Sequence, residues 1–501
     1  MDKKETSNSK IISNSIIYSA SGLLIKCFGF FLLPLYTQYL TKSDYGVTSI
    51  ATSFISTMSF IAAFSLYSAV MRFYVDLKDD PQKLSRFYGT ISLFVLISAS
   101  AFGVVLTFFK GFLEKKIFSG TSFFPIIFVC LISLVFECQH TIYQNVLRSQ
   151  QKAVKCSVLS LGYFFVTLGL NITFVVFLKK GALGVVLATM TANVLYTVYY
   201  WADMLLHGYM KICIDLPVLK EALKYSVPIM PHNLSTNIAT LVSKALIGGK
   251  VTLGALGVYS VATQFGNVTD TIQTYINNAY SPWLFEKLKD GDEGYKKSIR
   301  SVVRMLCSVI GVFFIGISLF AQDYIVLFVQ KSYVKAWTYI PLIILVYAIK
   351  TIYYFYVSIL LYYKKASKIL FTATLTSSIL NILLSYVFIP LWGVYGSLLA
   401  DALSMLVRVG IVVVISLRFE NIGLKISDFL LNFAIIATFI FGGLAFSCFK
   451  YKTTFSLLNF GYKILVMAAY CGLVFVMHRT EITRYIKSFK NKKIKKGEQK
   501  Q

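Results

Sequence analysis

The chain has 501 residues, of which 56% are hydrophobic, 16% aromatic and only 14% charged, and its mean hydropathy is +0.68. A soluble domain has about a quarter of its residues charged, so this composition excludes a soluble protein and predicts one embedded in a membrane. The net charge of +27 would suggest nucleic-acid binding in a soluble chain. Here the basic residues lie mostly between apolar runs, where the positive-inside rule accounts for them, and we predict no nucleic-acid partner.

Apolar runs of about 20 residues, the length of a helix that crosses a ~30 Å hydrocarbon core, recur along nearly the whole chain. Their apolar residues are continuous and do not alternate with polar ones as in barrel strands; residues 308–320, for example, read SVIGVFFIGISLF. The sequence therefore predicts an all-α integral membrane protein of about 14 transmembrane helices. We place these spans at 11–40, 46–72, 87–109, 122–148, 153–178, 181–206, 225–248, 255–282, 301–321, 336–361, 366–390, 392–418, 427–449 and 455–477.

An even number of spans puts both termini on one side of the membrane, and the basic loops indicate which side. With the termini inside, the inner segments hold 33 of the 49 Lys and Arg residues, the outer loops hold 11 and the spans hold five. This bias predicts a multi-pass protein of the bacterial inner (cytoplasmic) membrane with both termini cytoplasmic. Residues 1–10, the linker 207–224 and the basic tail 479–501 are then cytoplasmic. The tail either attracts anionic lipids or only sets the topology.

Two parts of the chain resemble each other. Residues 44–54 (DYGVTSIATSF) and 255–265 (ALGVYSVATQF) are identical at six of eleven positions, at an offset of 211, and two shorter matches further along keep nearly the same offset. This repeat predicts two parallel six-helix lobes, 11–206 and 225–418, around a central cavity, with two C-terminal helices added at 427–477. Two lobes of this kind usually alternate the access to their cavity by rocking, which favours a transporter.

Ionisable side chains inside spans are unfavourable in lipid, so each one is a candidate for function. Lys26 is either a cavity cation that binds phosphate or acidic sugars, or a lysine that snorkels to the interface. Glu137, His140 and Gln144 share one helical face. That face is either linked to proton movement, through Glu137 or His140, or forms hydrogen bonds between helices. His140 and Gln144 are also candidates for binding substrate in the cavity.

The predicted seventh and eighth spans carry rows of amides and hydroxyls, which either bind sugar hydroxyls or only pack helices together. The candidates for substrate binding there are Asn233, Asn237, Lys244, Gln264 and Asn267. Arg72, at the inner end of the second span, is either a first phosphate contact or a topology determinant.

Asp270 and Asp401 join Glu137 as candidates for ion coupling. Asp401 and Arg408 lie two turns apart in one span, and for them a salt bridge to a neighbouring helix is the competing interpretation. We predict no catalytic residue, no metal site and no organic cofactor, and we leave coupling to H⁺ or Na⁺ open.

Several segments carry a family resemblance, among them LPLYTQYLTKSDYGV (33–47), AVMRFYVD (69–76), LKEALKYSVPIMPHNL (219–234) and LNILLSYVFIPLWGVYGSLLA (380–400). They resemble the polysaccharide-type, Wzx-like flippases of O-antigen and capsule repeat units, within the multidrug/oligosaccharidyl-lipid/polysaccharide exporter superfamily. Near the end of the seventh span, where many of these flippases have an Asp-Arg pair, this chain has Ser243-Lys244. Ion coupling through that acid is therefore not implied here.

The resemblance implies a transporter, not an enzyme. It implies that the chain moves undecaprenyl-pyrophosphate-linked oligosaccharide repeat units from the cytoplasmic to the periplasmic leaflet, by alternating access, for surface polysaccharide export. Its implied partners are the lipid-linked oligosaccharide, membrane lipids, and polysaccharide polymerase and chain-length proteins.

Four other functions compete with this one. A lipid II-type flippase and an ion-coupled drug antiporter belong to the same superfamily. A polyprenyl-dependent membrane glycosyltransferase or polymerase is disfavoured, because the longest outer loop, 110–121, has Glu114 as its one acid. A scaffold without transport activity would lack the cavity.

Overall fold

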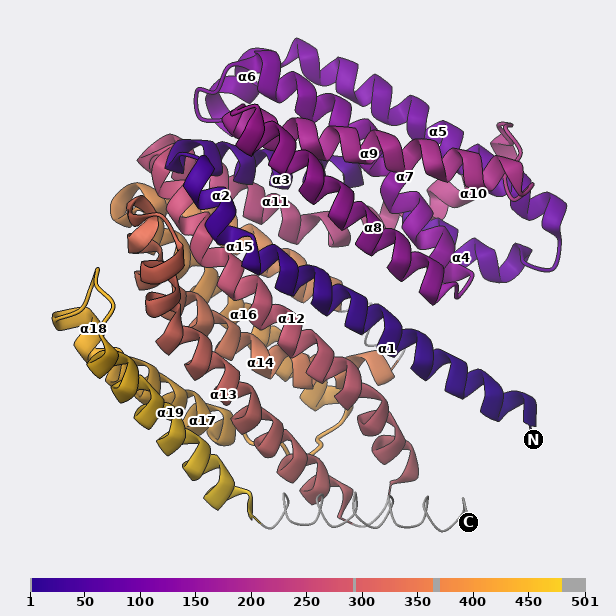
Figure 1. The fold of residues 1–501 in the computed structure, drawn as a ribbon. Helices are drawn as coiled ribbons and strands as arrows, with labels where there is room; N and C mark the ends of the chain where they lie inside the picture. The colour runs from indigo at the N-terminus through magenta and orange to yellow at the C-terminus, as the bar shows by residue number, and fades with distance from the viewer. Residues whose placement is uncertain (1, 292–293, 364–369, 480–501) are drawn as a thin grey trace, which may run out of the picture. The chain divides into compact units, whose positions relative to one another are not determined.

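The structure, a computed structural model, describes residues 2–291, 294–363 and 370–479. Every regular element in these residues is a helix (Figure 1). In chain order the elements are α1 (Asp2–Phe31), α2 (Leu33–Tyr39), α3 (Lys42–Ala62), α4 (Tyr67–Leu77), α5 (Pro81–Phe108), α6 (Lys110–Phe112), η1 (Leu113–Ile117), η2 (Phe123–Ile127), α7 (Phe128–Ser149), α8 (Ala153–Asn171), η3 (Ile172–Phe177), α9 (Gly181–Leu206), α10 (Leu216–Ser226), η4 (Val227–Ile229), α11 (Met230–Leu246), η5 (Ile247–Val251), α12 (Leu253–Asp290), α13 (Tyr295–Phe328), η6 (Lys331–Thr338), α14 (Ile340–Tyr362), α15 (Leu370–Trp392), α16 (Val394–Phe419), α17 (Ile426–Gly443), α18 (Ala445–Phe449) and α19 (Leu457–Met477).

Twelve helical segments among the described residues are long and apolar enough to cross a membrane. The all-α membrane class is confirmed, whereas the predicted count of fourteen spans is not. The two predicted spans outside the twelve are 225–248 and 255–282, which are helical but polar. The first is divided by Pro228 and Pro231 into short pieces, of which α11 has 17 residues. The second is the 38-residue α12, whose amides and carboxylate such as Asp270 lower its mean hydropathy.

Two predicted spans are divided by their backbone conformation. The span predicted at 11–40 becomes α1 and α2, and Pro34 lies in the first turn of α2, where a missing amide N–H is tolerated. The prediction of one continuous helix over 46–72 was wrong. Phe64 and Ser65 separate α3 from α4 with φ values of 49° and 52°, in the left-handed region that no right-handed helix can contain.

The chain divides into two compact units. The first contains residues 1–264, 329–336 and 371–408. Within it, α7 packs against α3, α4, α5 and α9, which run beside it in the purple part of Figure 1. Buried apolar residues of these helices, such as Phe87 and Leu134, form its core.

The linker 207–215 is fixed to this first unit. Lys211 donates its backbone N–H to the Ser85 carbonyl oxygen over 3.0 Å, and the Thr90 hydroxyl donates to the Cys213 carbonyl oxygen over 3.2 Å. A Cβ on Gly89 would collide with the Lys211 carbonyl oxygen. Glycine at position 89 therefore lets the linker lie directly on α5.

The second unit contains residues 265–328, 337–370 and 409–501. Within its described residues, α13 packs against α14, α17 and α19. The two helices that follow the internal repeat thus attach to α13. The predicted six-helix lobes, 11–206 and 225–418, stay a prediction.

The two best-matching repeat segments touch each other within the first unit. Gly46 of α3 and Gly257 of α12 are equivalent positions at the offset of 211. A Cβ on Gly46 would collide with the Leu253 carbonyl oxygen, and one on Gly257 with the Lys42 carbonyl oxygen. Three residues further along each helix, Ser260 and Ser49, also equivalent, are joined by a 2.7 Å hydrogen bond. Contact between identical positions of two similar segments is expected at a local two-fold axis.

Candidate functional site

The predicted polar face of α7 lies inside the first unit, against α8 and α9. The Glu137 carboxylate accepts a 3.0 Å hydrogen bond from the Asn193 side-chain amide. The Asn193 oxygen in turn accepts one of 2.8 Å from the Tyr163 hydroxyl. Glu137 is therefore held by a neutral amide of α9, not by a cation.

His140, one turn further along α7, lies against two tyrosines, with its ring tilted to both. The centroid of its ring lies 4.4 Å from that of Tyr163 and 4.2 Å from that of Tyr196. Gln144 donates to the Tyr196 hydroxyl over 2.9 Å and to the Ser160 hydroxyl over 3.1 Å. The three predicted residues thus belong to one polar cluster between α7, α8 and α9, whose aromatic members give it a largely neutral lining.

Lys244 places a cation at the contact between α11 and α3. Its Nζ donates to the Ser53 hydroxyl over 2.8 Å and to the Ser49 carbonyl oxygen over 3.4 Å. Within the described part of the chain, no carboxylate lies within ion-pairing distance of this ammonium group. Since Ser49 also bonds Ser260, the cation lies beside the crossing of the two repeat segments.

Asp401 of α16 is the centre of a second polar cluster in the first unit. Its carboxylate accepts hydrogen bonds from the Asn381 amide over 2.8 Å and from the Tyr259 hydroxyl over 3.4 Å. The Asn381 side chain also bonds Ser404, over 3.1 Å, and Ser243, over 3.4 Å. The carboxylate therefore accepts hydrogen bonds from an amide of α15 and a hydroxyl of α12, and hydroxyls of α11 and α16 contact that amide.

The competing expectation of a salt bridge at Asp401 was wrong for the described residues, because its partners are all neutral. Arg408 instead donates from Nε to the Ser377 hydroxyl over 2.7 Å. Asp401 and Arg408 face different neighbours although they share one helix. An acid in a span without a cationic partner is the arrangement expected of an ion-binding group.

Asp270, the third acid considered for ion coupling, has a different environment in the second unit. Lys350 of α14 lies 2.6 Å from its carboxylate, and the Tyr354 hydroxyl donates to the same oxygen over 3.1 Å. A resident lysine already compensates this charge. Asp270 is therefore a weaker candidate for ion coupling than Asp401.

The chain is similar to known proteins in sequence and in fold. A family model described as "Polysaccharide biosynthesis protein" matches residues 37–340, more than half of the chain. The chain belongs to this polysaccharide biosynthesis family. An uncharacterized membrane protein of Haemophilus influenzae is 22% identical over 401 residues, which cover 77% of this chain and 94% of that protein.

Two solved structures share the fold of this family member. The lipid II flippase MurJ in an inward closed conformation superimposes with a TM-score of 0.67 and 16% identity, over 93% of this chain and all of that chain. An inward-facing multidrug resistance MATE family transporter of the MOP superfamily gives a TM-score of 0.54 and 14% identity, over 83% and 98%. The expected fold is thus confirmed.

The remaining predicted residues of this family member belong to different helices. Lys26 is exposed near the middle of the first apolar span, and Arg72 pairs over 2.8 Å with Asp76 on its own helix. The side chain of Asn233 lies outside the described residues. Asn267 is exposed on α12.

The two other predicted amides lie in the first unit. The backbone oxygen of Asn237 accepts a 3.4 Å hydrogen bond from Thr57, and Gln264 is half-buried on α12. No substrate is present, so the assignment of the amides to sugar binding stays a prediction.

The sequence reasoning missed the most buried ion pair of this polysaccharide biosynthesis family member. Lys463 of α19 is 0% exposed, and its Nζ lies 2.6 Å from the Asp323 carboxylate and 2.6 Å from the Gln322 side-chain oxygen. Lys463 was recognised as a basic residue within a span, but Asp323 was not singled out. The signal that could have found the pair is the presence of one acid and one base near the predicted outer ends of their spans.

Proposed function

We propose that this protein flips undecaprenyl-pyrophosphate-linked oligosaccharide repeat units from the cytoplasmic to the outer leaflet of a bacterial inner membrane, by alternating access. The observation that carries the proposal is Lys244, a half-buried cation of α11 without an acidic partner in the described residues, beside the crossing of the two repeat segments. The family's link to polysaccharide biosynthesis and the flippase fold support it.

The chemistry of the substrate matches this cation. The negatively charged pyrophosphate group would serve as the ionic partner of Lys244. An ammonium group outside bulk water attracts phosphate strongly. Amides such as Asn237 and Gln264 both donate and accept hydrogen bonds, as sugar hydroxyls do.

Replacing Lys244 by methionine is expected to lower glycan export at least about tenfold, because one charge-assisted contact to phosphate contributes about 1.5–3 kcal/mol. Lys244→Arg keeps the charge and is expected to retain part of the activity. The measurement is the amount of surface polysaccharide, with the level of the membrane protein as a check. Lys250→Met, which removes an exposed lysine of η5, serves as the matched control.

The substrate is tested by deleting the gene. Lipid-linked oligosaccharide is expected to accumulate on the cytoplasmic face of the membrane, and normal arrival of glycan at the outer face would contradict the proposal. Accumulation of lipid II would assign the lipid II-type function instead. Loss of drug resistance with normal export would assign the antiporter.

We further propose that Asp401 couples transport to a gradient of H⁺ or Na⁺, because its carboxylate is surrounded by neutral oxygen and amide groups. Export by the wild type is expected to fall when the gradient is collapsed, and export by Asp401→Asn to be low and insensitive to the gradient. Asp270→Asn is the comparison variant, since Lys350 already pairs with that acid. A loss of gradient dependence in Asp270→Asn alone would move the assignment to the second unit.

The proposed location and partners follow from the same function. Both termini lie in the cytoplasm of the producing cell, so that the substrate made there enters from the inner side. A polymerase and chain-length proteins then receive the repeat units on the outer side.

A further inference from the structure

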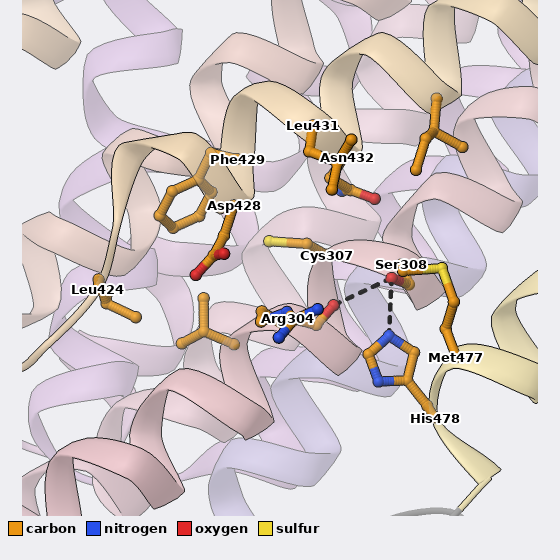
Figure 2. Close-up of a pocket in the computed structure, with 12 residues that line it drawn as sticks. Arg304, Cys307, Ser308, Leu424, Asp428, Phe429, Leu431, Asn432, Met477 and His478 are labelled. Carbon is orange, nitrogen blue, oxygen red and sulfur yellow. Dashed lines mark hydrogen bonds between the residues drawn. The ribbon is translucent and has the colours of Figure 1, made fainter.

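A pocket opens in the second unit where one end of α13 meets one end each of α17 and α19 (Figure 2). Its empty volume, open solvent included, is about 450 Å³. None of its lining residues belongs to the polar clusters around Glu137 and Asp401. Its lining comes from Val303, Arg304, Cys307 and Ser308, from Leu424, Asp428, Phe429, Leu431, Asn432 and Ile435, and from Met477 and His478.

The one acid of this lining is already neutralised. Arg300 holds the Asp428 carboxylate with two hydrogen bonds, of 2.6 Å from Nε and 2.8 Å from Nη2. A paired geometry of this kind is among the strongest that arginine forms with a carboxylate. The Asp428 carboxylate is therefore occupied by Arg300 and cannot fully neutralise a second cation.

Arg304, one turn after Arg300, is that second cation. It is exposed, lines the pocket, and forms no ion pair within 4 Å among the residues that the structure describes. Figure 2 shows its guanidinium between Asp428 and His478. Arg300, beside the pocket, and Arg304, in its lining, together carry one positive charge more than Asp428, the one acid of the lining.

The other polar groups form the wall beside Arg304. His478 is only 3% exposed, and its Nε2 lies 3.0 Å from the Ser308 hydroxyl. Asn432 adds an amide from α17. A cation, a hydroxyl, an imidazole and an amide facing one space are the groups that bind a phosphate.

The rest of the lining is apolar and reaches the surface of the helices. Leu431 is 57% exposed and Met477 is 41% exposed, and Ile435 continues the same face of α17. A ligand that fits must carry a negative head and an apolar chain. A free phosphate lacks the chain.

We propose that this pocket binds the headgroup of an anionic phospholipid of the membrane, with its phosphate on Arg304 and the start of an acyl chain along Leu431 and Ile435. Basic pockets between helices on the cytoplasmic side are known to hold such headgroups. The bound lipid would join α17 and α19 to α13, and this role is separate from the transported substrate.

The test measures lipid binding by the purified full-length protein in a neutral detergent. Phosphatidylglycerol, phosphatidylcholine and inorganic phosphate are titrated separately, and the melting temperature and the apparent Kd are recorded. We expect phosphatidylglycerol to stabilise the wild type and Arg304→Gln to weaken that binding about tenfold. Lys297→Gln, which removes an exposed cation of the same helix outside the pocket, should bind like the wild type.

A second variant keeps the proposal testable if Arg304→Gln does not fold. Asn432→Asp leaves Arg304 in place and adds a negative charge to the pocket, so it should also lose phosphatidylglycerol binding. Equal binding by the wild type and both variants would overturn the proposal. Equal stabilisation by inorganic phosphate would overturn the lipid as the ligand, and equal stabilisation by phosphatidylcholine would overturn the role of charge. None of these outcomes depends on transport.

Discussion

Replacing Gly257 by alanine is expected to lower glycan export at least about tenfold, although alanine is the better helix former. The new Cβ would collide with the Lys42 carbonyl oxygen, and backbone atoms of α3 cannot give way as a flexible side chain could. Overpacking of this kind typically costs about 1–3 kcal/mol. The crossing of α3 and α12 would have to open, which would separate Ser49 from Ser260.

Gly254 provides the matched control for this prediction, because it lies one turn earlier on α12. Its Cβ would meet only side-chain atoms, the nearest 3.6 Å away, in ordinary van der Waals contact. Gly257 lies deeper in the helix and gains up to about 1 kcal/mol of helix propensity as alanine, whereas Gly254 lies in the first turn of α12 and gains less. A loss confined to Gly257→Ala therefore comes from the crossing and not from propensity. Export and melting temperature should change in Gly257→Ala and stay close to the wild type in Gly254→Ala. Equal behaviour of the two variants would mean that the crossing is not needed for transport.

Replacing Lys463 by methionine is expected to destabilise the second unit by about 3–5 kcal/mol, the usual effect of removing one partner of a buried ion pair. Asp323 would remain 3% exposed and without its cation, and the Gln322 oxygen would lose a 2.6 Å donor. The measurement is thermal unfolding of the purified protein in one fixed detergent.

Removing both charges tests the physical reason for this loss. Lys463→Met combined with Asp323→Leu leaves no unpaired charge, and replacing a buried pair by apolar residues is often close to neutral. The double variant should therefore regain most of the lost melting temperature. Lys450→Met, which removes an exposed lysine directly after α18, should melt like the wild type. A double variant as unstable as Lys463→Met would place the effect in packing rather than charge.

The sequence by itself determined the membrane class, most of the helical spans and the similarity of the two repeat segments. A long apolar run directly predicts a helix in lipid, because each span must be apolar along its own length. The sequence also predicted spans at 225–248 and 255–282. The helices found there are too polar for their hydropathy alone to identify them as spans. The polar residues that make these two segments ambiguous also made them candidates for substrate binding.

The face of α7 could be predicted for a related reason. Glu137, His140 and Gln144 follow one helical period, so their common face was visible in the sequence. Their partners Tyr163, Asn193 and Tyr196 lie on other helices. The helical periodicity of α7 therefore could not predict these partners.

Only the tertiary structure decided which charges are paired. Asp270 has Lys350 beside it, Asp323 has Lys463, and Asp401 has neutral partners alone, yet all three look alike as single acids in helical segments. The reason is that each partner lies on a helix distant in sequence, and its choice depends on how the two helices rotate and tilt against each other. Local hydropathy and periodicity contain no information on that rotation, so the sequence predicted the candidates and the packing of the helices separated them.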